Sequence, residues 1–193
     1  MSPYPAQVDQ ASIVEKAREL IEQDGADNLT LAKLAAALNI KAPSLYKHIA
    51  SRAQLLKGVN TVTAQRLKSV MDGVRDAGLN RNETLYAISN AYRAFALANP
   101  ASYMLLYANL SVDARPDKQL MESIAIPLQQ LVGTEIPAGY SLEALRGALA
   151  LLHGFVTLEL NGQFQRGGDL EQAFQESIRA YFNGWANQSE SSK

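Results

Sequence analysis

The sequence predicts an all-α protein of about nine helices, and three observations support that prediction. Apolar residues recur with the 3.6-residue period of a helix in every long periodic stretch. No stretch shows the sustained alternation of apolar and polar residues that is typical of a strand. Helix-stopping pairs, such as Asp24-Gly25 and Asn99-Pro100, divide these stretches into segments of helical length.

The first three predicted helices are short and amphipathic. The first ends at Asp24-Gly25 and carries on one face Ile13, Val14, Ala17, Leu20 and Ile21. The second begins after Thr30, a good N-cap residue, and reaches about Leu38. Asn39 then tolerates the left-handed conformation that closes a helix. Pro43 fits the first turn of the third helix, because the N–H that proline lacks would be unpaired there.

Six longer helices are predicted from Ser51 onward. Ser51 caps the fourth, which reaches about 73–77, and the fifth runs from Asn82 to about 99. Helices at about 101–110 and 117–132 follow, and Pro127 is expected to kink the second of these. After a loop at 133–139, Ser141 is expected to cap a helix to about 164 and Asp169 one to about 185.

Composition excludes several classes of protein. The chain has 193 residues, 47% of them apolar and 19% charged, which fits a globular protein. It has no cysteine and only two histidines, so neither a thiolate site nor a histidine-rich catalytic or metal centre is expected. No secretory signal is visible, and the apolar run at 149–156 is too short to span a bilayer. We therefore expect a soluble cytoplasmic protein with no membrane association, metal or cofactor, and not an enzyme.

Positive charge is concentrated in one segment. Between Thr30 and Gly58 the chain has five cations and no acidic residue, a charge of +5, and because the whole chain carries −1 the remainder carries −6. A solvated basic face is the ordinary interpretation of such a segment. The cations coincide, however, with two short helices joined by a turn at Asn39-Ile40, which is the arrangement of a helix-turn-helix that binds DNA.

Candidate DNA contacts follow from what phosphates and bases accept. Phosphates bind cations, hydroxyls and helix N-termini, whereas base edges are reached from the start of the inserted helix. The candidate DNA-binding residues are Thr30, Lys33, Lys41, Ala42, Ser44, Tyr46, Lys47, His48 and Lys57. Tyr46 could instead pack against the first helix, His48 could be a buried capping histidine, and Ala42 with Pro43 could only shape the helix start.

The stretch LTLAKLAAALNIKAPSLYKHIASRAQLL resembles the N-terminal domain of TetR-family transcriptional regulators. Leu45, Tyr46 and His48 match the family's Leu-Tyr-x-His-aromatic signature, whereas Ile49 replaces the usual phenylalanine and Asn39 the usual glycine. The resemblance covers about residues 10–60. It implies that Tyr46 and His48 contact phosphates, and that Lys41, Ala42 and Ser44 lie nearest the bases.

The last two predicted helices are the most apolar, and the first of them is apolar nearly all round. Such a helix is buried on two sides, one of which can face a partner. TetR-like proteins dimerise through such a pair of helices. We expect an interface formed by Leu145, Leu149, Leu152, Val156, Phe174, Ile178, Tyr181, Phe182 and Trp185. The segment LLHGFVTLELNGQF is also similar to a TetR subgroup with a Trp-His-Gly signature, although Leu152 replaces the tryptophan.

An effector pocket is expected among the fifth to eighth helices, where aromatic residues gather. Its candidate residues are Tyr86, Tyr92, Phe95, Tyr103, Met104, Tyr107, His153 and Glu159. Each aromatic, taken singly, fits ordinary core packing equally well. His153 could be a pocket donor, an interface hydrogen bonder or a core histidine.

These observations predict two domains, a helix-turn-helix domain at 1–57 and a helical effector-binding and dimerisation domain at 58–193. The resemblance implies a homodimeric repressor that a small apolar effector, of unknown identity, releases from a palindromic double-stranded DNA operator. The alternative is a constitutive DNA-binding dimer whose C-terminal domain binds a protein partner. The chain has no glycine-rich phosphate loop that would favour an enzyme.

Overall fold

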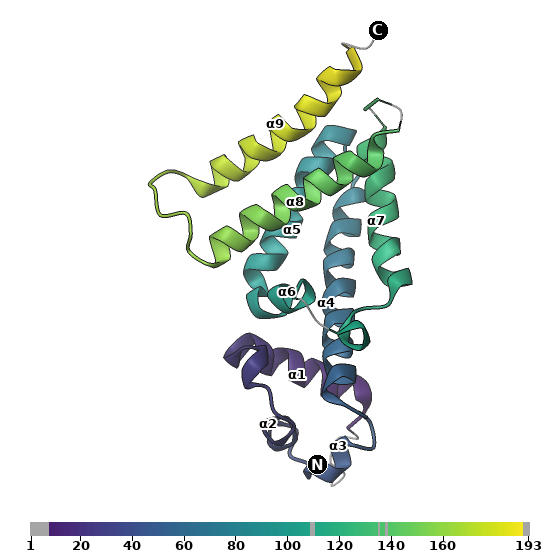
Figure 1. Cartoon of the computed structure of the whole chain (residues 1–193), viewed down its shortest axis with the longest axis vertical. Coiled ribbons are helices and arrows are strands. Elements are labelled where there is room, and N and C mark those ends of the chain that lie inside the picture. Colours follow the sequence, from purple (N-terminus) through teal and green to yellow (C-terminus); the bar gives the residue numbers. More distant parts are fainter. Residues whose placement is uncertain (1–7, 109–110, 135, 138, 191–193) are drawn as a thin grey trace. The chain divides into compact units, whose positions relative to one another are not determined.

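The structure, a computed structural model, describes residues 8–108, 111–134, 136–137 and 139–190, and all regular elements in this part of the chain are helices. The prediction of an all-α fold is confirmed. In chain order the helices are α1 (Gln10–Asp24), α2 (Leu31–Ala37), α3 (Ala42–Leu45), α4 (Arg52–Arg75), α5 (Arg81–Ala98), α6 (Pro100–Leu106), α7 (Lys118–Gly133), α8 (Ser141–Leu160) and α9 (Leu170–Glu190) (Figure 1). Two short 3₁₀ turns, η1 (Ala26–Asn28) and η2 (Val112–Ala114), lie between them.

The chain divides into two compact units. The first comprises residues 1–65 and 99–118, and the second comprises 66–98 and 119–193. The helix α4 therefore contributes to both units, and α6 with η2 belongs with the N-terminal helices. The predicted functional boundary at residues 57 and 58 remains a prediction, because compactness alone does not assign function.

Local signals in the sequence set most helix ends. Thr30 Oγ accepts a hydrogen bond from the Lys33 amide (3.1 Å), and Ser51 Oγ accepts one from the Gln54 amide (3.1 Å). Asp169 caps α9 by accepting from the amides of Glu171 (2.9 Å) and Gln172 (3.2 Å). Each cap satisfies an amide that has no partner within its helix, so these predictions are confirmed.

Several predicted ends were wrong. The fifth helix begins at Arg81 and not at Asn82. Asn80 caps it by exchanging hydrogen bonds with Glu83. Ser141 does not cap α8, because its hydroxyl accepts from Gln129 Nε2 (3.0 Å) instead. The helix α8 ends at Leu160 instead of 164, and α9 continues to residue 190 instead of 185. Pro127 lies inside α7, as predicted, and its kink remains a prediction.

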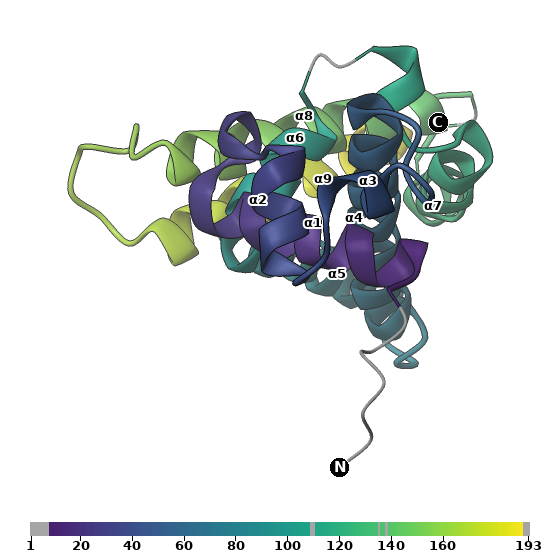
Figure 2. The same ribbon diagram turned by 90° about the horizontal axis from the view of Figure 1, so that it is seen from below.

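The first unit has its own apolar core. Its α1 begins at a capping box in which Asp9 and Ser12 exchange hydrogen bonds. The buried face of α1 packs with α2, α3 and the first half of α4. Figure 2 shows these helices from below. The buried residues of this core include Ile13, Ala17, Ile21, Leu34, Ala35, Leu45, Ile49, Leu55 and Val59.

The second unit is built around α5, α8 and α9, which pack against one another in pairs. Figure 1 shows α8 and α9 as an antiparallel pair. The core between these helices contains Leu85, Ile88, Tyr92, Ala148, Leu152, Val156, Phe174, Ile178 and Phe182. Burial of this many large apolar side chains is the main force that holds the unit together.

Candidate nucleic-acid interface

A tight turn at Asn39 joins the two helices of the predicted helix-turn-helix. The Asn39 amide donates to the Ala36 carbonyl oxygen (3.0 Å), and the Ile40 amide donates to that of Ala35 (3.0 Å). This geometry holds Asn39 at φ 54°, the only positive φ of a non-glycine residue in the described chain. Asparagine adopts this conformation more readily than most residues. The turn thereby fixes the direction in which α3 leaves α2.

Burial separates the inner and outer sides of the motif. Leu34, Leu45 and Ile49 are at most 2% exposed and anchor both helices to the core. With these anchors inward, the polar side chains of α3 and the turn after it are directed away from the core. Ala35 (3% exposed) leaves room for α3 to approach α2 closely, because its side chain is small.

Most of the candidate DNA contacts are open to solvent. Six of the nine are exposed: Thr30, Lys33, Lys41, Tyr46, Lys47 and His48. The other three are partly buried: Ala42, Ser44 and Lys57. Tyr46 is 60% exposed, so it is not buried against α1, and His48 is exposed and not a buried capping histidine. Their predicted phosphate contacts remain predictions.

The cations of the segment differ in how their charge is used. Lys33 Nζ lies 3.8 Å from Asp24 Oδ2, and both side chains are about half exposed. Lys41 and Lys47 form no ion pair within the described part of the chain. Their charge is therefore available to a polyanion, and both lysines flank α3.

Lys57 is placed differently from what its position in the sequence suggests. Its Nζ is 2.5 Å from Asp117 Oδ1, so this charge is paired within the first unit. Arg52, by contrast, is exposed at the start of α4 and donates from Nη2 to the Ala26 carbonyl oxygen (2.9 Å). Arg52 was missing from the candidate DNA-binding residues, although its position directly after the capping Ser51 indicates an exposed cation at a helix start.

The N-terminus of α1 lies within electrostatic reach of His48. The pKa of the Asp9 carboxyl is lowered, chiefly because the Ser12 amide donates to it, and the nearby His48 contributes in the same direction. The exposed end of α1 therefore shares its surroundings with a predicted phosphate-binding residue.

The candidate effector residues are divided between the two units. Tyr86, Tyr92, Phe95, His153 and Glu159 belong to the second unit, and Tyr103, Met104 and Tyr107 to the first. Tyr103 is fully buried, whereas Met104 and Tyr107 are 37% and 40% exposed. Tyr86 borders a hollow of about 150 Å³ with Asn90, Gln175, Ile178 and Arg179. Partial burial lowers the pKa of His153.

Glu159 takes part in a charged cluster that sequence reasoning missed. Its carboxylate accepts two hydrogen bonds of 2.7 Å from Arg93, which also pairs with Glu171. The Arg93 guanidinium lies 5.1 Å from the centre of the Phe174 ring, and its pKa is raised mainly by the bonds to Glu159. Arg93 on α5 thus joins α8 and α9. In the sequence, the only indication of this ion-pairing role was that Arg93 is a single arginine on an otherwise apolar face of its helix.

The candidate dimer residues are mainly buried within the single chain. Six are at most 6% exposed: Leu145, Leu152, Val156, Phe174, Ile178 and Phe182. Leu149, Tyr181 and Trp185 are partly buried. Tyr181 Oη donates to the Ala144 carbonyl oxygen (2.7 Å), and an added Cβ at Gly147 would lie 2.2 Å from this Oη.

No group of three or more His, Cys, Asp or Glu side chains that could hold a metal ion occurs among the described residues. One helix of this part, α8, is long and apolar enough to cross a membrane by length and composition alone. This helix packs against α5 and α9, and 28% of its apolar window is buried in the single chain.

Two family models match this chain. Residues 13–59 match "Bacterial regulatory proteins, tetR family", and residues 85–181 match "Tetracyclin repressor-like, C-terminal domain". A relative from Bacillus subtilis (strain 168), the uncharacterized HTH-type transcriptional regulator YobS, is 31% identical over 185 residues, which are 91% of each chain.

Solved structures share the fold at low sequence identity. A protein of unknown function from Rhodococcus sp. RHA1 superposes with a TM-score of 0.82 at 20% identity, over 96% of this chain and all of that one. BioQ bound to its natural double-stranded DNA operator superposes with a TM-score of 0.68 at 19% identity, over 93% of this chain and 99% of that one.

Proposed function

Because the chain belongs to the TetR family of bacterial regulatory proteins and is a DNA-binding transcriptional regulator, not an enzyme, we propose that it is a homodimeric repressor. A small apolar effector releases it from a palindromic operator in the cytoplasm. The observation that best supports this function is the exposure of the residues that flank α3. The cations Lys41 and Lys47 and the hydroxyl-bearing Tyr46 are exposed there, while Leu45 of α3 is buried.

In this proposal α3 enters the major groove. Lys41, Ala42 and Ser44 lie at its start, where side chains reach base edges, and the first turn therefore specifies the sequence. Tyr46 and His48 follow the helix and position the protein on phosphates, as Lys47 does. Thr30 and Lys33, at the N-terminus of α2, offer a further phosphate site. Lys57 binds a phosphate only if its ion pair with Asp117 breaks.

Dimerisation uses the faces of α8 and α9 that are directed away from the core. Over α8 the mean hydropathy reaches 1.2, yet only 28% of that window is buried in the single chain. Leu158 is 45% exposed, and an added Cβ at Gly154, one turn earlier, would contact nothing within 4 Å. On α9 the exposed small residues Ala173, Ala180 and Gly184 repeat at helical spacing. A second copy of the chain would cover these faces. The predicted interface residues that are buried in the single chain would support the two helices from the core side.

A two-fold dimer presents two copies of α3 to DNA. Such a pair addresses half-sites about 34 Å apart, one turn of the duplex, and so favours a palindromic operator. A large side chain at the dimer face opposes this assembly. We therefore expect Gly154→Leu to convert the dimer to monomers in sedimentation, whereas Gly73→Leu, at an open position of α4, leaves it dimeric.

The effector is proposed to bind within the second unit, near Tyr86, Tyr92 and Phe95, with His153 and Glu159 as polar partners. Each Glu159 oxygen accepts one hydrogen bond from Arg93 and keeps a lone pair that could accept from an effector, and the ion pair fixes the orientation of this carboxylate. An effector releases DNA only if it prefers the non-binding conformation.

The test is selection from a randomised duplex library, followed by gel shift. We expect the wild-type chain to enrich one palindromic sequence, and some apolar compounds to weaken its binding. Failure to enrich any duplex contradicts the DNA-binding proposal. Enrichment followed by binding that no compound in a broad apolar panel weakens contradicts the effector alone.

A further inference from the structure

The segment that contains α6 and η2, residues 99–118, is an integral part of the unit that carries the helix-turn-helix. Leu105 (6% exposed) of α6 and Ala114 (2% exposed) of η2 complete the apolar core formed by α1 to α4. These residues follow α5 in the sequence, so only the folded chain brings them to this core. Residues 99–118 are called the α6 segment below.

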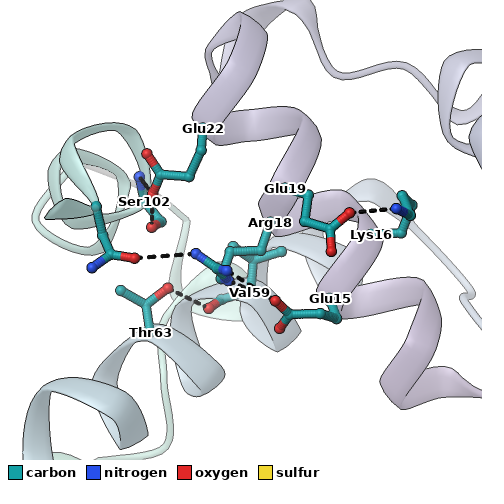
Figure 3. Close-up of polar contacts among 9 residues, drawn as sticks. Glu15, Lys16, Arg18, Glu19, Glu22, Val59, Thr63 and Ser102 are labelled. Atoms are coloured by element: carbon teal, nitrogen blue, oxygen red, sulfur yellow. Dashed lines mark hydrogen bonds and ion pairs between the residues drawn. The ribbon is translucent and has the colours of Figure 1, made fainter.

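Glu22 of α1 holds the first turn of α6. This turn has no cap of its own, because the Asn99 side chain forms no capping bond and Pro100 has no N–H. The amides of Ala101 and Ser102 donate instead to the two carboxylate oxygens of Glu22, each at 3.0 Å. The Ser102 hydroxyl donates to the same carboxylate, as Figure 3 shows. Three donors and the positive end of a helix thus converge on one negative charge.

Three further polar contacts join the α6 segment to α1 and α4. Arg18 Nη1 donates to Asn99 Oδ1 (3.2 Å), Asn60 Nδ2 to the Ala114 carbonyl oxygen (2.9 Å), and Lys57 pairs with Asp117 (2.5 Å). These contacts hold the segment at its start, through Asn99, and near its end, through Ala114 and Asp117.

The contacts differ in strength. Lys57 and Asp117 are 40% and 67% exposed, and exposed ion pairs contribute little. Arg18 shares its guanidinium with Glu15, its neighbour on α1 (2.9 Å), which Figure 3 also shows. The Glu22 contact is stronger, because Ser102 is fully buried and both amides would otherwise have no partner in their helix.

We infer that Glu22 is a positioning residue that couples the α6 segment to the helices that bind DNA. Withdrawal of α6 would remove all three donors from Glu22 and so alter the support of α1, which also packs against α2. By linkage, operator binding must then change the stability of the first turn of α6 in return. This inference rests on the proposed DNA-binding function.

Hydrogen exchange of the full-length chain tests this coupling, with and without a duplex selected by the wild-type protein. In the wild type we expect the duplex to slow exchange of the peptide 99–106 by about fivefold or more. In Glu22→Gln, which leaves only one acceptor oxygen, exchange of the free protein should rise by about tenfold. Bound duplex should then no longer slow it.

Glu19→Gln is the matched control, since Glu19 lies on the same helix and pairs with Lys16, not with α6. It should behave as the wild type. Ser102→Ala, which removes one donor and keeps both amide bonds, should show an intermediate response. Equal slowing by the duplex in Glu22→Gln and the wild type overturns the inference, as does no slowing in a wild type that binds the duplex. A wild type that selects no duplex overturns the proposed function itself, and this inference with it.

Discussion

The contact between Gly58 and Val14 makes a sharp test of how α4 supports α1. An added Cβ at Gly58 would lie 2.6 Å from Val14 Cγ2 and 3.5 Å from Cγ1. Val14 is 5% exposed and β-branched, so its methyl groups have little freedom to rotate away. The substitution Gly58→Ala must therefore strain Val14 or separate the two helices.

The expected magnitude follows from two opposing terms. Overpacking of this kind costs about 1–3 kcal/mol. Alanine in place of glycine within a helix contributes roughly 1 kcal/mol of stability. Gly73→Ala, later in α4, provides the second term alone, because its added Cβ would meet nothing within 4 Å. Gly58→Ala should thus be less stable than Gly73→Ala by about 1–3 kcal/mol.

Urea unfolding at one fixed protein concentration, followed by helical circular dichroism, measures this difference. In a Val14→Ala background the nearest methyl group is absent, so Gly58→Ala should there behave like Gly73→Ala. We also expect Gly58→Ala to weaken operator binding, because α1 supports the helix-turn-helix. Equal stabilities of Gly58→Ala and Gly73→Ala, or an unchanged effect in the Val14→Ala background, would refute this reasoning.

Three other predictions concern charged groups. Lys47→Ala should weaken binding to all DNA sequences alike and reduce the slope of log affinity against log salt by about one, and an unchanged slope rules out a phosphate contact. Arg93→Ala should lower the free energy of unfolding by about 3–5 kcal/mol, because it leaves Glu159 largely buried without its partner. Urea unfolding measures this loss, and a loss no larger than that caused by replacing an exposed arginine with alanine contradicts the prediction. The hydrogen bond from Arg93 lowers the pKa of Glu171 below its usual 4.5, so its stabilisation is present above that pH and lost as the pH falls through the lowered value. The melting temperature of Glu171→Gln should accordingly fall less with acidification than that of the wild type. An equal fall in both proteins would show that Glu171 does not cause the loss of stability.

Features that depend on a few neighbouring residues were predictable from the sequence. The helical class follows from periodicity, and the caps at Thr30 and Asp169 form hydrogen bonds within three residues of the chain. The left-handed turn at Asn39 is equally local. The exposed outer side of α3 could also be expected, because the buried positions of a short helix follow from its apolar spacing.

Ser141 shows where local reasoning fails. It has the right chemistry for an N-cap, yet its hydroxyl bonds to Gln129 on another helix. The same holds for Lys57, whose partner Asp117 follows it by 60 residues. In both cases a competing partner, distant in the sequence, decided what the side chain does.

The sequence by itself determined the helical class, the caps at Thr30, Ser51 and Asp169, and the family to which the chain belongs. Only the tertiary structure decided that α6 joins the DNA-binding unit, that Glu22 caps it across 80 residues, and that Arg93 joins three helices. It also decided which apolar face of α8 is covered by the chain itself. The physical reason is that a cap or a turn is stabilised by atoms a few residues away, whereas these contacts exist only after helices far apart in the sequence have packed.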